Sequence, residues 1–351
     1  MSDKREYEPS TPRRLSRRSF LRLALLGGIG ISAAALHKVT QPVGAITYTR
    51  WLARGTAARV APPAVVALGQ CTAYDASVLD CLREVWAQAD MPDVTGKRVL
   101  VKPNLIDYIE PYPITTSTLV IGAVIDLLRE RGAGEIVVGD GPGFRRDAGP
   151  VVKATGLAAE LARRKVAFVD LDYDDPRPVP LADGWFPGTP QLWLPRHVRE
   201  AQLIVSVPKL KTHHWAGVSL SLKNLFGIVP GTRYGWPKNI LHINGITPSI
   251  LGLYQTVRPM VSVVDGIVGM EGDGPLFGSA VAHGLLAVGR DPVAVDVTCA
   301  RLMGFSLKDI PHLAAADWAG VGQTARIETR GASEQLIRHY ERPPGWGSGK
   351  G

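Results

Sequence analysis

A cluster of lysines and histidines follows an apolar segment near the middle of the chain. Residues 203–207 read Leu-Ile-Val-Ser-Val, a pattern that predicts a buried strand, and Pro208 ends it. Two lysines, a threonine and two histidines come soon afterwards. Ammonium groups and imidazoles are costly to bury in a core, but they can bind a ligand and transfer protons. We therefore predict that residues 208–214 form the centre of a functional site.

Polar side chains follow several segments that the sequence predicts as strands. In parallel α/β sheets, ligands bind outside the carboxyl ends of the strands. Single charges after strands are also common in solvated loops, so it is the agreement among several strand ends that indicates a site. These polar clusters are Lys102 to Asn104, Asp140, Lys209 to His214, and Asp265 to Asp273.

The candidate residues fall into three groups by the chemistry of their side chains. The candidates for catalysis are His213, Lys211, Lys209 and Asp273. The candidates for binding a small anionic ligand are Lys102, Asn104, Thr115, Thr116, Lys223 and Asn224. The candidates for metal ligation are His213, His242, Asp265 and Glu271.

The anion site is predicted from three lysines and a helix start. Lys102, Lys209 and Lys211 supply point charges, and a helix that begins near residues 115–117 supplies free N–H groups and a partial positive charge. A carboxylate or a phosphate suits such a pocket. The structural alternative is ordinary capping of the helix by Thr115 or Thr116.

A divalent metal is a candidate cofactor because imidazole and carboxylate side chains recur in these segments. Together they suit zinc, iron, nickel or manganese. No H-E-x-x-H spacing is present, so tertiary structure must assemble any metal site. Hydrogen-bonding histidines are the alternative. If His213 and His214 lie in extended backbone, only one of them faces the pocket, and we expect that one to be His213.

A glycine-rich loop at residues 139–143 does not have the spacing of a dinucleotide site. The sequence Gly-Asp-Gly-Pro-Gly differs from G-x-G-x-x-G, and Pro142 removes a backbone donor that a phosphate needs. We therefore predict no nicotinamide or flavin site of the Rossmann type.

Asp296 is an acidic residue in a predicted helix, residues 291–304, that is otherwise largely apolar. An ionised carboxylate in such a place needs a partner such as a lysine, or its pKa rises. A structural ion pair with Arg290 or Arg301 is the alternative.

Composition and charge exclude some functions. The chain has 351 residues, of which 45% are hydrophobic and 21% are charged, as in foldable globular proteins. Its formal charge is +8, but residues 1–36 hold seven basic and only three acidic residues. No later block of lysine and arginine is interleaved with aromatic residues, so nucleic-acid binding is not expected. Cys71 and Cys81 are either a disulfide pair or two partly buried free thiols.

The N-terminus predicts export. Residues 16–22, Ser-Arg-Arg-Ser-Phe-Leu-Arg, are followed by an apolar segment at 23–36 that is too short for an ordinary membrane-spanning helix. The segment resembles the twin-arginine translocation signals of bacteria. That resemblance implies the twin-arginine machinery as a partner, the periplasm or cell surface as the location, and no stable transmembrane anchor.

Short apolar strands alternate with amphipathic helices along the rest of the chain. This order predicts an α/β fold with a mostly parallel sheet and helices on both faces, in a single large domain. The predicted strands are 64–68, 98–101, 135–138, 166–169, 203–207, 260–264 and 285–288, and the predicted helices are 77–88, 115–131, 150–164, 247–257 and 291–304. The Pro-rich segment 176–195 is predicted as an edge hairpin. We expect a linker at 37–62, the domain at 63–335 and a flexible tail at 336–351.

Several of these motifs, taken in order, resemble the domain-of-unknown-function 362 (DUF362) family over residues 64–322. The motifs are Val101 to Asn104, Thr115-Thr116, Ser206 to His213, Ser221 to Gly227, Val264 to Val268, Glu271 to Pro275, and Asp291 to Asp296. The resemblance implies an activity that is mostly uncharacterised. Many members look like iron–sulfur proteins because they carry a ferredoxin-type segment. This chain has no C-x-x-C-x-x-C run, so we do not expect an iron–sulfur cluster.

Two functions are consistent with these features. The first is an exported enzyme that acts on a small anionic substrate, with a metal as a candidate aid to catalysis. The second is a non-catalytic anion- or metal-binding protein of the cell envelope, in which the same lysines hold an anion without chemistry.

Overall fold

The computed structural model describes residues 53–54, 57–58, 61–143, 146–181, 191–243, 245–257, 259–332 and 334–346. All of them belong to one compact unit that begins at Thr49. The predicted export signal at 1–36 and most of the predicted linker lie outside the described residues. Within the described residues, no helix has the length and hydrophobicity needed to cross a lipid bilayer.

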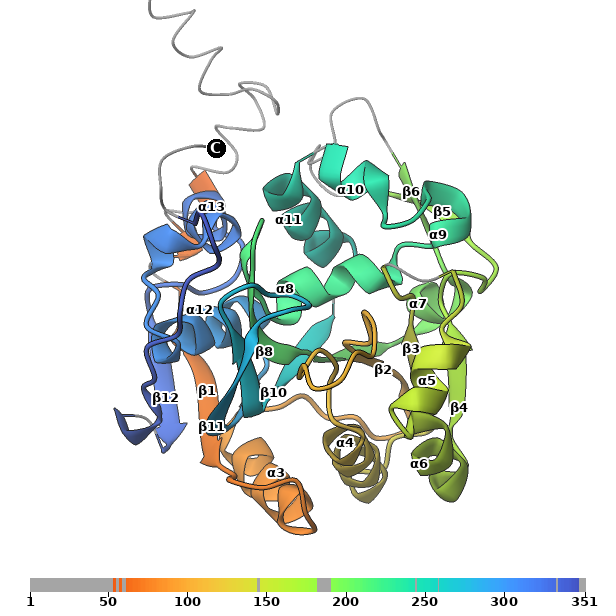
Figure 1. Cartoon of the computed structure of the whole chain (residues 1–351), viewed down its shortest axis with the longest axis horizontal. Coiled ribbons are helices and arrows are strands. Elements are labelled where there is room, and N and C mark those ends of the chain that lie inside the picture. The colour runs from red at the N-terminus through yellow and green to blue at the C-terminus, as the bar shows by residue number, and fades with distance from the viewer. Residues whose placement is uncertain are drawn as a thin grey trace, which may run out of the picture. The chain divides into compact units, whose positions relative to one another are not determined.

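A ten-stranded sheet forms the centre of the described domain (Figure 1). Its strand order is β12 (Ile327–Gly331), β1 (Ala64–Gln70), β11 (Ser279–Gly289), β10 (Met260–Glu271), β7 (Leu203–Val207), β2 (Arg98–Pro103), β3 (Glu135–Asp140) and β4 (Ala167–Asp170). Along this path only β11 runs antiparallel to its neighbours. β8 (Lys209–His213) pairs in parallel with β10, and β9 (Gly217–Ser219) pairs with β8. The prediction of a mostly parallel α/β sheet is confirmed.

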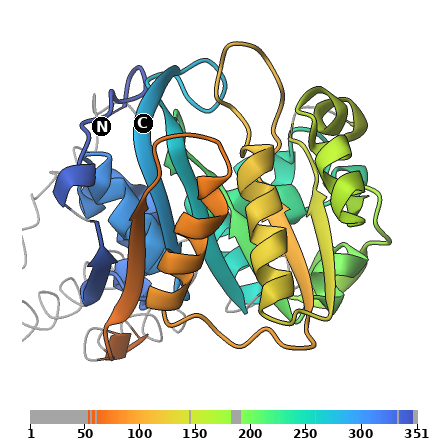
Figure 2. The same ribbon diagram turned by 90° about the horizontal axis from the view of Figure 1, so that it is seen from below.

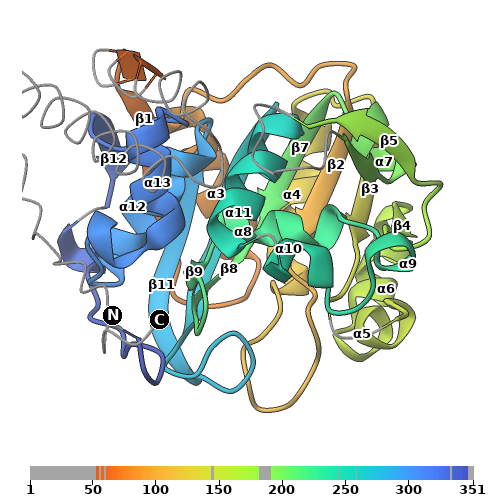
Figure 3. The same ribbon diagram turned by 90° about the horizontal axis from the view of Figure 1, so that it is seen from above.

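Helices cover both faces of this sheet, as predicted. One face carries α3 (Ser77–Gln88), α4 (Thr118–Glu130), α5 (Gly149–Ala154) and α6 (Leu157–Arg164) (Figure 2). The other carries α8 (Ser221–Asn224), α10 (Asn239–Ile243), α11 (Ile246–Thr256), α12 (Pro292–Leu302) and α13 (Pro311–Ala319) (Figure 3). The remaining helical segments are α7 (Arg196–Glu200), α9 (Gly231–Tyr234), η1 (Leu225–Ile228), η2 (Leu307–Asp309) and η3 (Glu334–Leu336).

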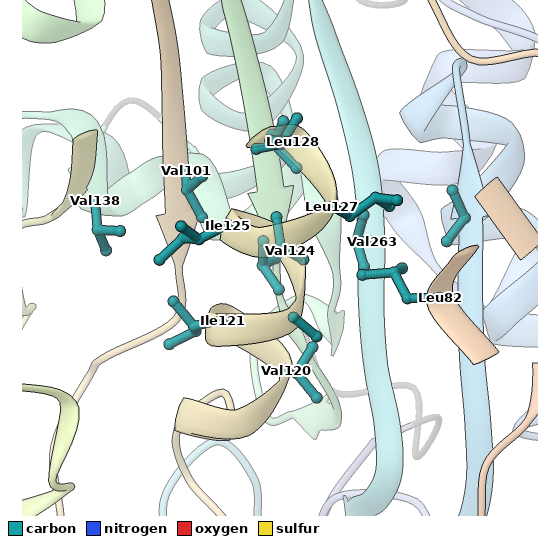
Figure 4. Packing of buried hydrophobic residues seen from close by; sticks show 14 of the residues in the cluster. Leu82, Val101, Val120, Ile121, Val124, Ile125, Leu127, Leu128, Val138 and Val263 are labelled. Carbon is teal, nitrogen blue, oxygen red and sulfur yellow. The ribbon is translucent and has the colours of Figure 1, made fainter. Parts of the chain in front are cut away.

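Helix α4 shows how the sequence builds the core. Ser117 caps it by accepting a hydrogen bond from the backbone N–H of Leu119 at 3.3 Å. Apolar residues at helical spacing then face the sheet. They pack against Val101 of β2, Val138 of β3 and Val263 of β10 (Figure 4). Burying each such side chain contributes about 1.5–3 kcal/mol.

The helix predicted at residues 150–164 is instead two helices, α5 and α6. Gly156 separates them with a φ of 77°, a left-handed conformation that interrupts an α-helix and that glycine adopts without strain. The Pro-rich segment does contain a hairpin. Its strands β5 (Arg177–Pro180) and β6 (Gln191–Leu194) form a separate two-stranded sheet and do not extend the edge of the main one.

Two segments that were predicted as loops after strands are themselves strands. Residues 209–213 form β8, and β10 continues through Asp265 to Glu271. The extension is stabilised because β10 pairs with β11 as far as Glu271 and Ser279, with an irregularity between Gly266 and Val268. Asp265 therefore lies in the middle of a strand and not at its end.

Residues 336–346 belong to the segment predicted as a flexible tail. Leu336 and Tyr340 are buried, and the backbone N–H of Gly272 donates to the carbonyl of Glu341 at 3.0 Å. Tyr340 fits against β10 because Gly269 has no side chain at the point of contact. Residues 336–346 thus pack on the domain. The Pro/Gly-rich composition of the segment had instead predicted a flexible tail.

Candidate functional site

A pocket of about 260 Å³ lies at the carboxyl ends of β2 and β3. The turn after β8, the segment from α8 to η1, and the segment that contains α10 supply further walls. The polar and aromatic lining residues are Lys102, Asn104, Asp140, His213, His214, Trp215, Ser219, Lys223, Asn224, Phe226, Lys238 and His242. The prediction that several strand ends meet at one site is therefore supported for β2, β3 and β8.

Lys102 is fully buried at the end of β2 and pairs with Asp140 at the end of β3. The Nζ atom lies 2.6 Å from Asp140 Oδ1 and also donates to the carbonyl of Pro103 at 2.7 Å. Burial lowers the pKa of Lys102, and the charge of Asp140 opposes that shift. Asp140 Oδ2 in turn accepts from the backbone N–H of Leu105 at 2.8 Å. The two opposite charges compensate each other, and the ion pair links the ends of β2 and β3.

Asn224 connects this ion pair to α8. Its amide nitrogen donates to the carbonyl of Lys102 at 3.0 Å and to Ser206 Oγ at 3.1 Å. Its oxygen accepts from Asn104 Nδ2 at 3.1 Å. Asn104 Oδ1 is then left buried without a hydrogen-bond partner among the described residues. Because a buried unpaired acceptor costs about 1–3 kcal/mol, a ligand that donates to Asn104 would be favoured.

A second neutralised cation in the pocket is Lys238. It forms an ion pair with the buried carboxylate of Asp172 and donates to the carbonyl of Val229 at 2.6 Å. Asp172 also accepts from the backbone N–H of Gly231 at 2.7 Å. Neither residue was predicted from the sequence, because no spacing links positions 172 and 238.

Lys223 differs from these two lysines. Its Nζ atom lies 3.8 Å from the centre of the Phe226 ring, and no carboxylate of the described residues forms an ion pair with it. Burial, reinforced by the charge of Lys102, lowers the pKa of Lys223 to about 7. Lys223 therefore gains or loses its proton near neutral pH.

Asp296 sets the position of the short helix that carries Lys223. Its two carboxylate oxygens accept from the backbone N–H groups of Ser221 and Leu222, each at 2.9 Å. These bonds satisfy two of the free donors at the start of α8. Burial raises the pKa of Asp296 to about 7, although the two donors oppose the shift. The raised pKa agrees with the prediction for a buried carboxylate. The partners of Asp296 are backbone N–H groups and not Arg290 or Arg301, which were the alternative.

The histidines of the pocket differ in where their protons lie. Backbone N–H groups of Trp215 and Ala216 donate to Nδ1 of His213 at 3.1 and 3.3 Å, so a neutral His213 carries its proton on Nε2. Nδ1 of His242 faces the carbonyl of Lys238 at 3.2 Å, which places the proton on Nδ1 and the lone pair on Nε2. Burial and the nearby Lys223 lower the pKa of both imidazoles. The pocket thus combines a neutral N–H donor with a neutral proton acceptor.

Both His213 and His214 line the pocket, which corrects the expectation that only His213 does. β8 ends at His213 and the chain turns immediately afterwards, so the alternation of a strand does not apply to His214. The wall continues from His214 to Trp215 and His242, with ring centroids 4.7 and 5.2 Å apart. The side chain of Trp215 is largely exposed at this wall.

Lys209 and Asp265 form a separate buried cluster and do not line the pocket. Lys209 Nζ lies 3.0 Å from Asp265 Oδ2 and donates to the hydroxyl of Tyr74 at 2.6 Å. Asp265 Oδ2 also accepts from the backbone N–H of Ser117 at 2.8 Å. The predicted open helix start is therefore occupied by a carboxylate of the chain itself. Neither predicted threonine caps the helix, because Ser117 does so.

The other predicted residues also have structural partners or lie elsewhere. Lys211 is fully buried and donates to the carbonyl of Ile114 at 2.7 Å. Thr116 donates to the carbonyl of Val207 at 2.6 Å and accepts from the backbone N–H of Asn104. Thr115 and Asp273 do not line the pocket, and Asp273 is exposed. These residues support the walls of the pocket or lie outside it.

The four predicted metal ligands are not brought together. His213 and His242 line the pocket, Asp265 is held by Lys209, and Glu271 accepts from the backbone N–H of Glu341 at 2.9 Å. Among the described residues, no group of three or more histidine, cysteine, aspartate or glutamate side chains is arranged to hold a metal ion.

Fold and site together define an α/β protein with a ligand pocket at the carboxyl edge of a mostly parallel sheet, at the place where such folds bind ligands. More particularly, residues 99–301 match the model of the domain of unknown function DUF362, and the chain belongs to that family.

Comparison with known proteins gives one clear relative in sequence. The chain is 30% identical over 233 residues to the thylakoid-associated protein sll1697 of Synechocystis, which covers 66% of this chain and 70% of that protein.

Two solved structures are more distantly similar. The lactate racemase apoprotein of Thermoanaerobacterium thermosaccharolyticum is 14% identical with a TM-score of 0.42, over 69% of this chain and 57% of that one. A protein from Thermotoga maritima is 12% identical with a TM-score of 0.31, over 59% of this chain and 53% of that one. The chain thus matches less than two thirds of the length of either structure.

Proposed function

We propose that this protein is an enzyme that binds a small carboxylate in the pocket and transfers a proton to and from it. The observation that carries the proposal is Lys223. The charges of Lys102 and Lys238 are each neutralised by a carboxylate, whereas no described carboxylate pairs with Lys223. A pocket with one uncompensated cation attracts one negative charge.

The groups around Lys223 match the needs of proton removal from a carbon next to a carboxylate. His242 offers the Nε2 lone pair as the base. The ammonium of Lys223 and the Nε2–H of His213 stabilise the negative charge that develops on the carboxylate oxygens as the proton leaves. Asn104 Oδ1 accepts a hydrogen bond from a hydroxyl or amino group elsewhere on the ligand.

Hydrogen exchange into small carboxylates tests the proposed chemistry. The purified protein would be incubated in D₂O with short carboxylates, with and without a neighbouring hydroxyl or amino group, and carbon-bound deuterium would be followed by NMR. We expect exchange above the protein-free rate for at least one compound, and a loss of about 100-fold or more in His242→Gln. A compound that binds in the pocket without any exchange would instead identify a non-catalytic anion-binding protein.

We also propose that the protein is exported by the twin-arginine route. The paired arginines at positions 17 and 18, followed by a short apolar segment, support this proposal, although they lie outside the described residues. The double substitution Arg17→Lys and Arg18→Lys should leave the protein in the cytoplasm of a bacterial host. Fractionation and immunoblotting would check this, with Arg13→Lys and Arg14→Lys as the matched control. Equal export of the two variants would contradict the proposal.

A further inference from the structure

Two cysteines lie together at the junction of β1 and α3, away from the pocket. Cys71 directly follows β1, and Cys81 lies in the second turn of α3. Cys71 is 3% exposed and Cys81 is partly exposed. The thiol of Cys81 donates to the carbonyl of Gln70, the residue before Cys71, at 3.9 Å, and each thiol shifts the pKa of the other, as expected for neighbouring side chains.

The backbone holds the two sulfur atoms in this position. The N–H of Cys71 donates to the carbonyl of Gly284 at 2.8 Å, which fixes the end of β1 against β11. Gly69 leaves room for the sulfur of Cys81, because a Cβ atom at position 69 would lie 2.7 Å from it. The two cysteines are therefore held close to each other by β1 and α3, and not by a chance contact between flexible loops.

The loop between the cysteines is fastened at its middle. The hydroxyl of Tyr74 donates to Asp265 Oδ1 at 2.8 Å, and it accepts from Lys209 Nζ and from the backbone N–H of Val268. The loop thus has three fixed points, which are its two ends and Tyr74. Little chain entropy remains to oppose a bond between the two sulfur atoms.

The environments of the two thiols are unequal. The interaction with the Cys81 side chain lowers the pKa of Cys71 to about 7, against the effect of burial. The same interaction and burial raise the pKa of Cys81. A thiolate at Cys71 is the nucleophile, and the neighbouring thiol of Cys81 is placed to react with the product.

We propose that Cys71 and Cys81 form an oxidation site that hydrogen peroxide converts into an intramolecular disulfide. The Cys71 thiolate attacks one peroxide oxygen, the O–O bond breaks, and hydroxide leaves, which gives a sulfenic acid at Cys71. The sulfur of Cys81 then attacks the sulfur of Cys71, loses its proton, and releases the oxygen as water. Two thiols are oxidised, and one peroxide molecule is reduced to two molecules of water.

Peptide mapping after treatment of the full, reduced protein with hydrogen peroxide tests the site. The native protein would be oxidised, its remaining thiols alkylated, and its peptides analysed by mass spectrometry. We expect a Cys71–Cys81 cross-link, and we expect Cys299 to stay reduced because its pKa is raised where that of Cys71 is lowered. Recovery of Cys71 and Cys81 as separately alkylated residues, or an equal loss of all three thiols, would overturn the proposal.

Single substitutions separate the two roles. Cys81→Ser removes the second thiol, so the sulfenic acid at Cys71 should persist and be trapped by a 1,3-dione. Cys71→Ser should slow oxidation of Cys81 by at least about tenfold, since the remaining thiol is mostly protonated. Cys299→Ser is the matched control and should form the cross-link as the native protein does. Circular dichroism would verify that each variant is folded, and equal reactivity of Cys71→Ser and Cys81→Ser would contradict the assigned roles.

Discussion

Lys223→Met is expected to weaken the binding of sulfate to the pocket by about 10- to 100-fold, which corresponds to one lost charge-assisted hydrogen bond. The substitution keeps most of the length of the side chain and its contact with Phe226, but it removes the uncompensated cation. Isothermal titration calorimetry with sulfate would measure the change. Lys308→Met, which removes an exposed lysine far along the sequence on η2, is the matched control and should bind as the native protein does.

The pH dependence of this binding follows from the pKa of Lys223. The ammonium form is present below about pH 7 and is lost as the pH rises through that value. Sulfate keeps its charge between about pH 6 and 9, so its affinity should fall over this range as Lys223 loses its proton. Burial lowers the pKa of His213 and of His242, so these imidazoles contribute less positive charge to the pocket than exposed histidines would. Lys223→Arg should retain binding to higher pH, because arginine stays charged.

Two results would contradict this account of the pocket. If the affinity for sulfate does not change with pH, the bound sulfate does not interact with the ammonium group of Lys223. Equal affinity in Lys223→Met and in the native protein would place the anion at another site. Either result would also remove the main support for the proposed enzyme.

The sheet and the general place of the site could be predicted from the sequence because both depend on local patterns. The buried run at 203–207 and the capped helix start at Asp291-Pro292 each specify an element from adjacent residues. Lys102, Asn104 and His213 follow such runs, so they could be placed near a common edge. The boundaries of β8 and β10 could not be predicted, since both strands extend through pairing with distant segments.

The charge state of each lysine could not be predicted from the sequence. Lys102, Lys209 and Lys223 are all preceded or followed by apolar residues and look equivalent. The role of each lysine depends on the carboxylate that pairs with it. These partners lie far away in the sequence: Asp140 pairs with Lys102, and Asp265 pairs with Lys209. Lys223 differs from these two because no carboxylate in the described part of the chain forms an ion pair with it.

This pattern assigns two tasks to the cations of the sheet edge. Buried ion pairs hold strand ends in place, and Lys223, which lines the pocket and has no carboxylate partner among the described residues, is available to a ligand. Substitutions that break a buried ion pair should lower the free energy of unfolding. Substitution of Lys223 should lower the affinity for the ligand. Substitutions in the two sets should therefore give separable results.

Asp140→Asn should lower the free energy of unfolding by about 3–5 kcal/mol, because it leaves the buried ammonium of Lys102 without a counter-charge. Urea denaturation at neutral pH would measure the loss. Glu130→Gln is the matched control, since the Arg83–Glu130 ion pair is exposed and its removal should change stability little. The double variant Asp140→Asn with Lys102→Met should recover part of the stability, because it no longer buries an unpaired charge.

The loss in Asp140→Asn should also depend on pH in a defined direction. Without Asp140, burial lowers the pKa of Lys102 further below its unfolded value, so the unfolded chain binds the proton more tightly than the folded chain. Stability of this variant should therefore rise with pH above the lowered pKa, and its deficit relative to the native protein should shrink in alkaline buffer. A deficit that stays constant from neutral to alkaline pH would show that Lys102 is not the charge left unpaired. A loss no larger than that of Glu130→Gln would show that the pair does not hold the ends of β2 and β3 together.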